Sequence, residues 1–233
     1  MYTHQLLIRM PAPEFQDEVD RLLKRLRGSG YLHSEEMERA FRTVPREEFV
    51  LPDSRRHAYR DTPLSIGRGQ TISAPHMCVI MCEGLELRPG HRVLEVGAGS
   101  GYHAALCAEL IAPTGSETRG HVYTVEIVEG LIDFARENLE RAGYADRVTL
   151  VHGDGGKGLP EVAPFDRILV AAAAPGIPAP LIDQLAPEGL MMIPVGGRGF
   201  YQDLLFVRKK RDGSVERRNW GGVAFVPLTG EFG

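Results

Sequence analysis

Cysteine is scarce in this chain, and its few copies do not form a recognisable site. The three cysteines, Cys78, Cys82 and Cys107, are an odd number and lie in apolar stretches, which is typical of reduced core thiols and not of a disulfide framework. Cys78 and Cys82 would share one helical face, but no further Cys or His accompanies them at metal-ligand spacing. We therefore expect no metal.

The sequence also lacks a cationic excess and a long apolar run. Lys and Arg total 27 against 31 Asp and Glu, a net charge of −4, and no long basic run is present to hold a polyanion by counterion release. Residues 1–10 lack the apolar core of a signal peptide, and no segment approaches the roughly 20 apolar residues that span a bilayer. We expect a cytoplasmic protein that binds neither nucleic acid nor membrane. Without a heptad run, a monomer is the default.

The order of segments predicts one domain, 1–233, with a helical lead-in over residues 1–58. Apolar residues recur at helical intervals over 14–27, and Ser34 is placed to cap a second helix. Residues 59–75 have glycines and short polar residues without periodicity, so we expect a long loop without helix or strand, of the kind that usually carries function. A helix over 75–87 follows.

Residues 91–233 alternate between strand-like and helix-like stretches, which predicts an α/β fold. We expect a mixed, mostly parallel sheet of about seven strands with helices on both faces, closed by a hairpin edge. Asp212-Gly213, after the basic run 208–211, predicts the hairpin turn. The stretches after the first strand and helix are 122–126, 131–142, 148–151, 167–174, 178–185, 190–195, 204–208 and 223–226.

The most informative stretch is 93–102, where an apolar run ends in Gly97, Gly99 and Gly101 and passes into a helix-like segment. Glycines are needed at a strand-to-helix turn whose backbone takes positive φ and lets a ligand approach closely, beside free N–H groups of the helix. The spacing is G-x-G-x-G and not the G-x-G-x-x-G of dinucleotide-binding sites, so a pyrophosphate is not the expected ligand group.

Two acidic residues follow later strands, at the sheet edge where the glycine turn also lies. Glu126 ends the strand over 121–126, and Asp154-Gly155 follows the next. Glu126 would accept from two ribose hydroxyls, the Asp154 region would face adenine, and the glycine turn would hold an amino-acid tail. A single nucleoside with a charged tail is therefore predicted. A surface Glu126 and a turn-forming Asp154 are the simpler alternatives.

Several motifs resemble those of a known family. The stretch 93–102 resembles the first motif of S-adenosylmethionine-dependent methyltransferases, and the wider pattern is similar to that of protein-L-isoaspartate O-methyltransferases. The likeness follows that family's order from about Ser34 to Thr229, and the string from Gln70 to Pro75 is its most particular part. The matching motifs are Gly69-Gln70-Thr71-Ile72-Ser73-Ala74-Pro75-His76-Met77, His152-Gly153-Asp154-Gly155, Ala171-Ala172-Ala173-Ala174-Pro175, Ile193-Pro194-Val195-Gly196 and Phe225-Val226-Pro227-Leu228-Thr229.

The resemblance implies a Rossmann-like methyltransferase fold and a repair activity. Methyl would pass from S-adenosylmethionine, which becomes S-adenosyl-L-homocysteine, to the free α-carboxylate of an isoaspartyl residue in damaged proteins and peptides. The ester then closes to a succinimide. Ser73 and Thr71 are implied as catalytic residues, with no metal. The implied cofactor-binding residues are Gln70, Thr71, Ile72, His76, Glu95, Gly97, Ala98, Gly99, Ser100, Gly101, Glu126, Asp154, Gly155 and Thr229.

The chemistry of such a transfer suits these residue types. A carboxylate acceptor has a pKa of about 4, so it is already an anion and needs no general base. Orientation and exclusion of water remain to be supplied, and the hydroxyls of Ser73 and Thr71 can donate to the carboxylate. The structural alternative for Ser73 is a helix cap, since it lies two positions before Pro75.

Three other functions stay open at this point. The chain could methylate a different small molecule or nucleic acid, although the acidic net charge and the 70–75 string argue against this. The strand over 167–174 also ends in alanines and lacks the Asn/Asp-Pro-Pro-Tyr pattern of base methylases. A binding module without catalysis is the second alternative, but Thr71, Ser73 and Glu126 are retained. A nicotinamide oxidoreductase is the third, and its glycine spacing is missing.

Overall fold

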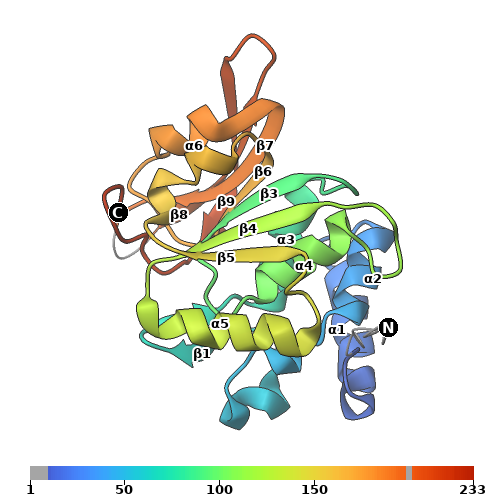
Figure 1. Cartoon of the computed structure of the whole chain (residues 1–233). Helices are drawn as coiled ribbons and strands as arrows, with labels where there is room; N and C mark the ends of the chain where they lie inside the picture. The colour runs from blue at the N-terminus through green and yellow to red at the C-terminus, as the bar shows by residue number, and fades with distance from the viewer. Residues whose placement is uncertain (1–9, 198–200) are drawn as a thin grey trace, which may run out of the picture.

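The fold is described from a computed structural model, which describes residues 10–197 and 201–233 (Figure 1). Residues 1–9 and 198–200 lie outside the described part, so the expectation that residues 1–10 contain no signal peptide falls almost entirely outside it. Across the described ranges, no helix has both the length and the apolar character needed to cross a membrane.

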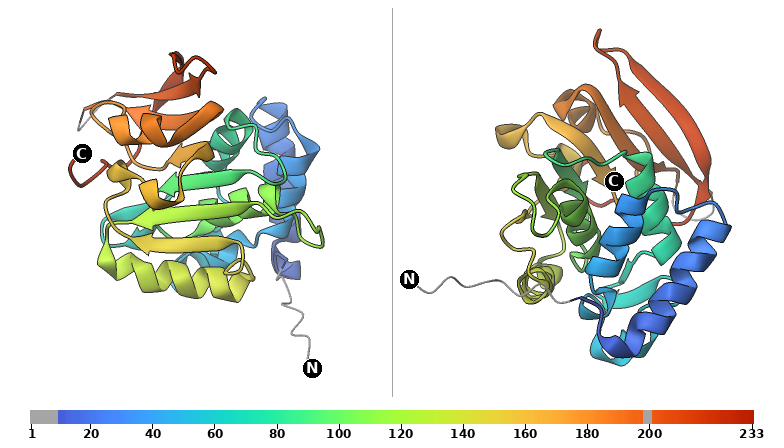
Figure 2. Two further views of the ribbon diagram at one scale, coloured as in Figure 1. Left: turned by 45° about the horizontal axis from the view of Figure 1, so that its top comes forward. Right: turned by 90° about the vertical axis from the view of Figure 1, so that its right-hand side faces the viewer.

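The lead-in is helical, as the apolar periodicity predicts. The expected cap is present, because Ser34 Oγ accepts from the backbone N–H of Met37 at 3.2 Å. Figure 2 shows the first two α-helices, in blue, grouped beside α3 and α4. The elements are η1 (Pro13–Phe15), α1 (Gln16–Gly28), α2 (Glu35–Thr43), η2 (Arg46–Glu48) and η3 (Pro52–His57).

The expectation that 59–75 contains no strand is wrong. β1 (Leu64–Gly67) and β2 (Gln70–Ile72) form an antiparallel hairpin. These strands are too short to show a period-two apolar pattern. The turn between them places Arg68 at φ 56° and Gly69 at φ 74°, and a left-handed conformation is not expected at an arginine from the sequence. α3 (Pro75–Gly84) then begins at the predicted proline and ends before residue 87.

One seven-stranded sheet forms the body of the molecule, in the order β5-β4-β3-β6-β7-β8-β9. Strands β3 to β7 run parallel, and β8 is antiparallel to both of its neighbours, which confirms the mixed, mostly parallel sheet. The strands are β3 (Arg92–Val96), β4 (His121–Glu126), β5 (Val148–His152), β6 (Phe165–Val170), β7 (Leu185–Val195), β8 (Gln202–Lys209) and β9 (Val215–Val223).

Helices cover both faces of the sheet. Because alternate residues of each central strand point to opposite sides, each strand contributes side chains to the core on both faces. On one face Val93 and Leu169 share a buried cluster with α1 to α5. On the other, Leu94 and Val170 pack with Leu181 of α6. The predicted helices on both faces are confirmed. The α-helices that follow β3 are α4 (Tyr102–Ile111), α5 (Glu129–Ala142) and α6 (Ala179–Gln184). Two short 3-10 turns, η4 (Gly155–Lys157) and η5 (Pro160–Val162), precede β6.

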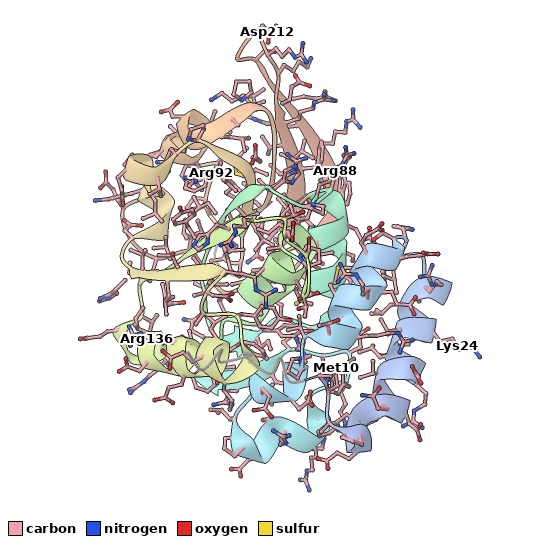
Figure 3. All side chains as sticks on the ribbon, turned by 45° about the vertical axis from the view of Figure 1, so that its right-hand side comes forward. Met10, Lys24, Arg88, Arg92, Arg136 and Asp212 are labelled. Atoms are coloured by element: carbon pink, nitrogen blue, oxygen red, sulfur yellow. The ribbon has the colours of Figure 1, made fainter. Side chains whose placement is uncertain are left out.

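The β8–β9 hairpin projects from the sheet with Asp212 at its tip (Figure 3). The predicted turn is present, with Gly213 at φ 83° and its N–H bonded to Lys210 O at 2.9 Å. The basic run is not purely solvated, because Lys209 Nζ donates to backbone carbonyls at the end of α6, including Leu185 O at 2.8 Å. The hairpin is therefore tied to the body of the molecule.

The predicted last strand over 223–226 is wrong, because β9 ends at Val223. The side chain of Gln202 satisfies both backbone groups of Phe225, at 2.6 and 2.9 Å, in place of a strand ladder. The chain then turns toward β6, where Ala173 N donates to Val226 O at 2.8 Å and Leu228 N donates to Ala173 O at 2.7 Å. This route carries the C-terminal segment across the carboxyl end of the sheet.

Candidate active site at the carboxyl ends of the strands

A cavity lies beyond the carboxyl ends of β3, β4 and β6 and encloses about 780 Å³, including its solvent-open mouth. From β3 the chain runs outward through β4 to β5 and then returns to the opposite side of β3 as β6. Such a switch point is where ligands bind in open α/β sheets. The cavity is lined by residues from the segments 70–73, 95–103, 125–128, 171–172 and 226–229, with Cys78 and Gly155.

The glycine turn forms the floor of this cavity. Gly97, Gly99 and Gly101 have φ values of 92°, 55° and 87°, so each takes the left-handed conformation that favours glycine. Gly97 and Gly99 line the cavity. Gly101 does not; its N–H donates to Ala98 O at 2.8 Å and it caps α4, so it shapes the turn.

Glu126 is fixed at the end of β4 by two backbone donors. Gly99 N donates to Oε2 at 2.8 Å and Val128 N donates to Oε1 at 2.9 Å, and only 5% of the residue is exposed. A carboxylate oxygen has more than one lone pair, so each oxygen can still accept from a hydroxyl. The carboxylate is therefore oriented toward the cavity as an acceptor pair, and it is not a surface charge.

Glu95 is the second carboxyl group in the cavity wall, and it is fully buried. Its Oε2 accepts from the hydroxyl of Thr124, while Oε1 has no hydrogen-bond partner. Burial and, to a smaller extent, the negative charge of Glu126 together raise the pKa of Glu95 to about 8, although the hydrogen bond from Thr124 lowers it. In the free protein at neutral pH the group is mostly protonated, with an oxygen available to a polar or cationic ligand.

Gln70, Thr71, Ile72 and Ser73 form the opposite wall. Thr71 and Ser73 also line an adjoining cavity, together with Met77, Phe225 and other residues, so their hydroxyl-bearing side chains stand between two spaces. The N-cap of α3 is Ala74, and no side chain caps that helix. The capping alternative for Ser73 is therefore not what the structure shows.

Two of the expected cofactor-binding side chains lie elsewhere. His76 lines the adjoining cavity, where its Nδ1 lies 2.9 Å from Asp61 Oδ1. Asp154 caps η4, accepting from Gly156 N at 3.0 Å, and also accepts from Glu231 N at 2.9 Å. Its neighbour Gly155 does line the cavity. The remaining expected residues that line it are Gln70, Thr71, Ile72, Ser73, Glu95, Gly97, Ala98, Gly99, Ser100, Glu126 and Thr229.

Several lining residues were not expected from the sequence. Tyr102 and His103 enter from the first turn of α4, and Cys78 enters from α3. Burial lowers the pKa of His103 to about 4, so its imidazole is neutral, and Nε2 lies 3.3 Å from Cys78 O. The position of Tyr102 and His103, directly after the glycine turn, was the one available signal for them. Ala171 and Ala172 follow β6 and leave room in the wall.

Known proteins are similar to this chain in sequence and in fold. A model of the protein-L-isoaspartate(D-aspartate) O-methyltransferase (PCMT) family matches residues 17–233. The chain is 59% identical over 222 residues to the protein-L-isoaspartate O-methyltransferase of Hyperthermus butylicus, across 94% of this chain and 91% of that protein. Its identity to the protein of that name from Methanopyrus kandleri is 55% over 219 residues, 94% of each. A solved structure of a putative protein-L-isoaspartate O-methyltransferase from Plasmodium falciparum, in complex with S-adenosyl-L-homocysteine, matches with a TM-score of 0.79 and 29% identity, over 90% of this chain and 97% of that one.

Proposed function

This chain belongs to the protein-L-isoaspartate(D-aspartate) O-methyltransferase family, and from this premise we propose how its residues carry out the reaction. The protein transfers a methyl group from S-adenosylmethionine to the free α-carboxylate of L-isoaspartyl residues in damaged proteins, and the ester then closes to a succinimide. The roles proposed for individual residues rest on two adjoining cavities. The glycine turn and Glu126 line the first cavity, and Thr71 and Ser73 line both the first and the second.

The first cavity suits S-adenosylmethionine. Gly97 and Gly99 present backbone without a Cβ, Glu126 can accept from ribose hydroxyls, and the unpartnered Oε1 of Glu95 suits a cationic group. When bound there, the co-substrate supplies a methyl group activated on a positively charged sulfur. We propose that Gly101 shapes the turn and that the expected cofactor-binding residues lining the cavity contact the co-substrate. These are Gln70, Thr71, Ile72, Glu95, Gly97, Ala98, Gly99, Ser100, Glu126, Gly155 and Thr229.

His76 and Asp154 do not line the first cavity, so we propose other roles for them. Because His76 faces the adjoining cavity, we propose that it contacts the acceptor side. The carboxylate of Asp154 accepts hydrogen bonds from Gly156 N and from Glu231 N in the C-terminal segment. We propose that it fixes the position of Gly155, which would contact the adenine.

The acceptor carboxylate needs alignment and not deprotonation, because it is an anion at neutral pH with a pKa of about 4. We propose that Ser73 and Thr71 donate hydrogen bonds to it and aim one oxygen at the methyl group. A hydroxyl binds the carboxylate without competing strongly as a nucleophile. Ile72 and Leu228 are buried in the cavity wall and exclude water from the line of attack.

We further propose that the chain is a single domain that acts as a monomer in the cytoplasm on damaged proteins and peptides, with no nucleic acid or membrane as partner. The net charge of −4 and the absence of a long basic run support the choice of partner. Cys78, Cys82 and Cys107 are buried and unbridged, which is typical of a reducing compartment.

The testing experiment uses labelled S-adenosylmethionine and two peptides that differ only in L-isoaspartate or L-aspartate at one position. Alkali-labile methyl ester on the isoaspartyl peptide alone is the expected result. Equal ester on both peptides, or none on either with the co-substrate still bound, would contradict it and point to another acceptor or to a binding module.

A further inference from the structure

Arg46 joins the two ends of the segment that carries the acceptor-side residues. It lies in η2, directly after α2, and none of its surface is exposed. Its Nε donates to Ala58 O at 2.7 Å and its Nη2 donates to Ser73 O at 2.6 Å. Ala58 precedes and Ser73 follows the stretch 59–72, which contains the β1–β2 hairpin with Gln70 and Thr71. One guanidinium therefore holds both ends of this stretch together.

The charge of Arg46 is not balanced by a carboxylate. In the described ranges no ion pair reaches Arg46, and its Nη1 has no hydrogen-bond partner. The guanidinium carbon lies 4.8 Å from the ring centre of Tyr102, a cation–π contact that offsets part of the cost. A fully buried charge is almost always paired, so an uncompensated one in this place calls for a functional reason.

The surroundings of Arg46 supply such a reason. Ser73 and Tyr102, the two residues that it contacts on this side, both line the first cavity, and Ser73 also lines the adjoining one. The guanidinium thus lies behind the wall at which an acceptor carboxylate must arrive. Its field favours an anionic group there over a neutral one, because charge interactions are strong where water is excluded.

We propose that Arg46 is a positioning residue of the methyl transfer: it fixes the backbone of Ser73 and both ends of 59–72, and its uncompensated charge favours a carboxylate acceptor. The inference rests on the proposed role of Ser73. Arg46 touches neither substrate; it acts through the orientation of the Ser73 and Thr71 hydroxyls and through its field. A structural arginine would instead affect stability and both substrates alike.

The first test compares Arg46→Lys, which keeps the charge but not the two-carbonyl clamp, with Arg46→Met, which loses both. Because a misplacement of about 1 Å at a reacting centre can cost about 100-fold, we expect Arg46→Lys to lower kcat by about 10- to 100-fold. Arg46→Met should in addition raise KM for an isoaspartyl peptide by about 10-fold. Affinity for S-adenosyl-L-homocysteine should stay within about 2-fold in both.

Arg147 provides a matched control. It also donates to two backbone carbonyls, Ala112 O at 2.8 Å and Gly143 O at 3.1 Å, but its charge is paired with Glu109 and Asp146 and it lines neither cavity. Arg147→Lys should lower thermal stability while kcat/KM stays within about 2-fold. Parallel losses of peptide turnover and S-adenosyl-L-homocysteine affinity in the Arg46 variants, or unchanged kcat and KM, would overturn the inference.

A double-mutant cycle separates this inference from the function on which it rests. If Arg46 acts through Ser73, Arg46→Lys should cost less than about 3-fold in a Ser73→Ala background, because effects of residues that act as a unit are not additive. Multiplying effects would reject the positioning role and leave that of Ser73 intact. Full activity of Ser73→Ala alone would instead reject the proposed role of Ser73. Should Arg46→Met fail to fold, Arg46→Lys and this cycle still decide.

Discussion

The backbone N–H of Gly99 donates to Oε2 of Glu126 across 2.8 Å. This bond ties the turn after β3 to the end of β4, so the two elements expected to hold opposite parts of a nucleoside are fixed relative to each other before any ligand binds. Preorganisation of this kind removes part of the ordering cost of binding. It also makes Glu126 sensitive to replacement by its own amide.

Glu126→Gln should weaken S-adenosyl-L-homocysteine binding by about 1.5–3 kcal/mol, the usual value of a charged hydrogen bond. The amide keeps one acceptor oxygen, but its NH₂ group must face either Gly99 N or Val128 N, both of which are donors. Isothermal titration calorimetry measures the change. Glu129→Gln, at an exposed residue at the start of α5, is the control and should bind like the wild type.

Ser73→Ala should lower kcat for an isoaspartyl peptide by about 10- to 100-fold, because one oriented donor to the acceptor is lost. Affinity for S-adenosyl-L-homocysteine should change little, since the hydroxyl serves the acceptor. Steady-state kinetics with the peptide, beside calorimetry, checks both values. Ser214→Ala, in the distant β8–β9 turn, is the control. A wild-type kcat in the Ser73 variant would exclude the donor role.

Glu95 should make the free protein less stable as pH rises from about 4.5 to 8. The raised pKa of about 8 means that the folded chain keeps a proton that the unfolded chain loses near its ordinary value. Below both pKa values, and again above both, the group contributes no pH dependence. Urea unfolding at pH 5, 6.5 and 8 should show a decline that Glu95→Gln removes. An identical decline in the variant would assign it to other groups.

Binding of S-adenosylmethionine at pH 7 should release protons, because a positive charge in the cavity stabilises the ionised form of Glu95. S-adenosyl-L-homocysteine lacks the sulfonium charge and should release fewer. Calorimetry in two buffers with different ionisation enthalpies counts the protons. Glu95→Gln should abolish the difference between the buffers, and equal heats for the wild type in both buffers would contradict the prediction.

Glu109→Gln should lower the free energy of unfolding by about 3–5 kcal/mol, because removing one partner of a buried ion pair leaves an uncompensated charge. At temperatures where the variant stays folded, kcat should be unchanged. Glu109 is fully buried and binds Arg39 at 2.7 Å, Arg147 at 3.3 Å and the hydroxyl of Thr114 at 2.6 Å, away from both cavities. Urea unfolding is the measurement. Asp133→Asn, in an exposed pair with Arg136, should cost less than about 1 kcal/mol.

The sequence by itself determined the architecture and the place of the first cavity at the carboxyl ends of the strands. Short apolar runs that alternate with helix-like stretches over 91–233 predicted the sheet and its helices, because strands that are buried on both faces are apolar throughout. The glycines of 97–101 and the position of Glu126 predicted the cavity at the carboxyl ends of the strands. Both follow directly after predicted strands, and the carboxyl ends of parallel strands meet at one edge of the sheet.

The tertiary structure alone decided the residues whose roles depend on distant partners. Nothing in the local pattern shows that Arg46 bonds to Ala58 and Ser73, that His76 faces Asp61, or that Asp154 holds Glu231. The β1–β2 hairpin and the C-terminal turn toward β6 belong to the same group, since Gln202 and Ala173 provide contacts that chain neighbours do not. The periodicity of apolar residues shows which side of a helix or strand is buried. A long-range hydrogen bond depends instead on which distant segment packs beside that element in the folded chain. The wall formed by Thr71 and Ser73, which we propose binds the acceptor, depends mainly on such long-range contacts.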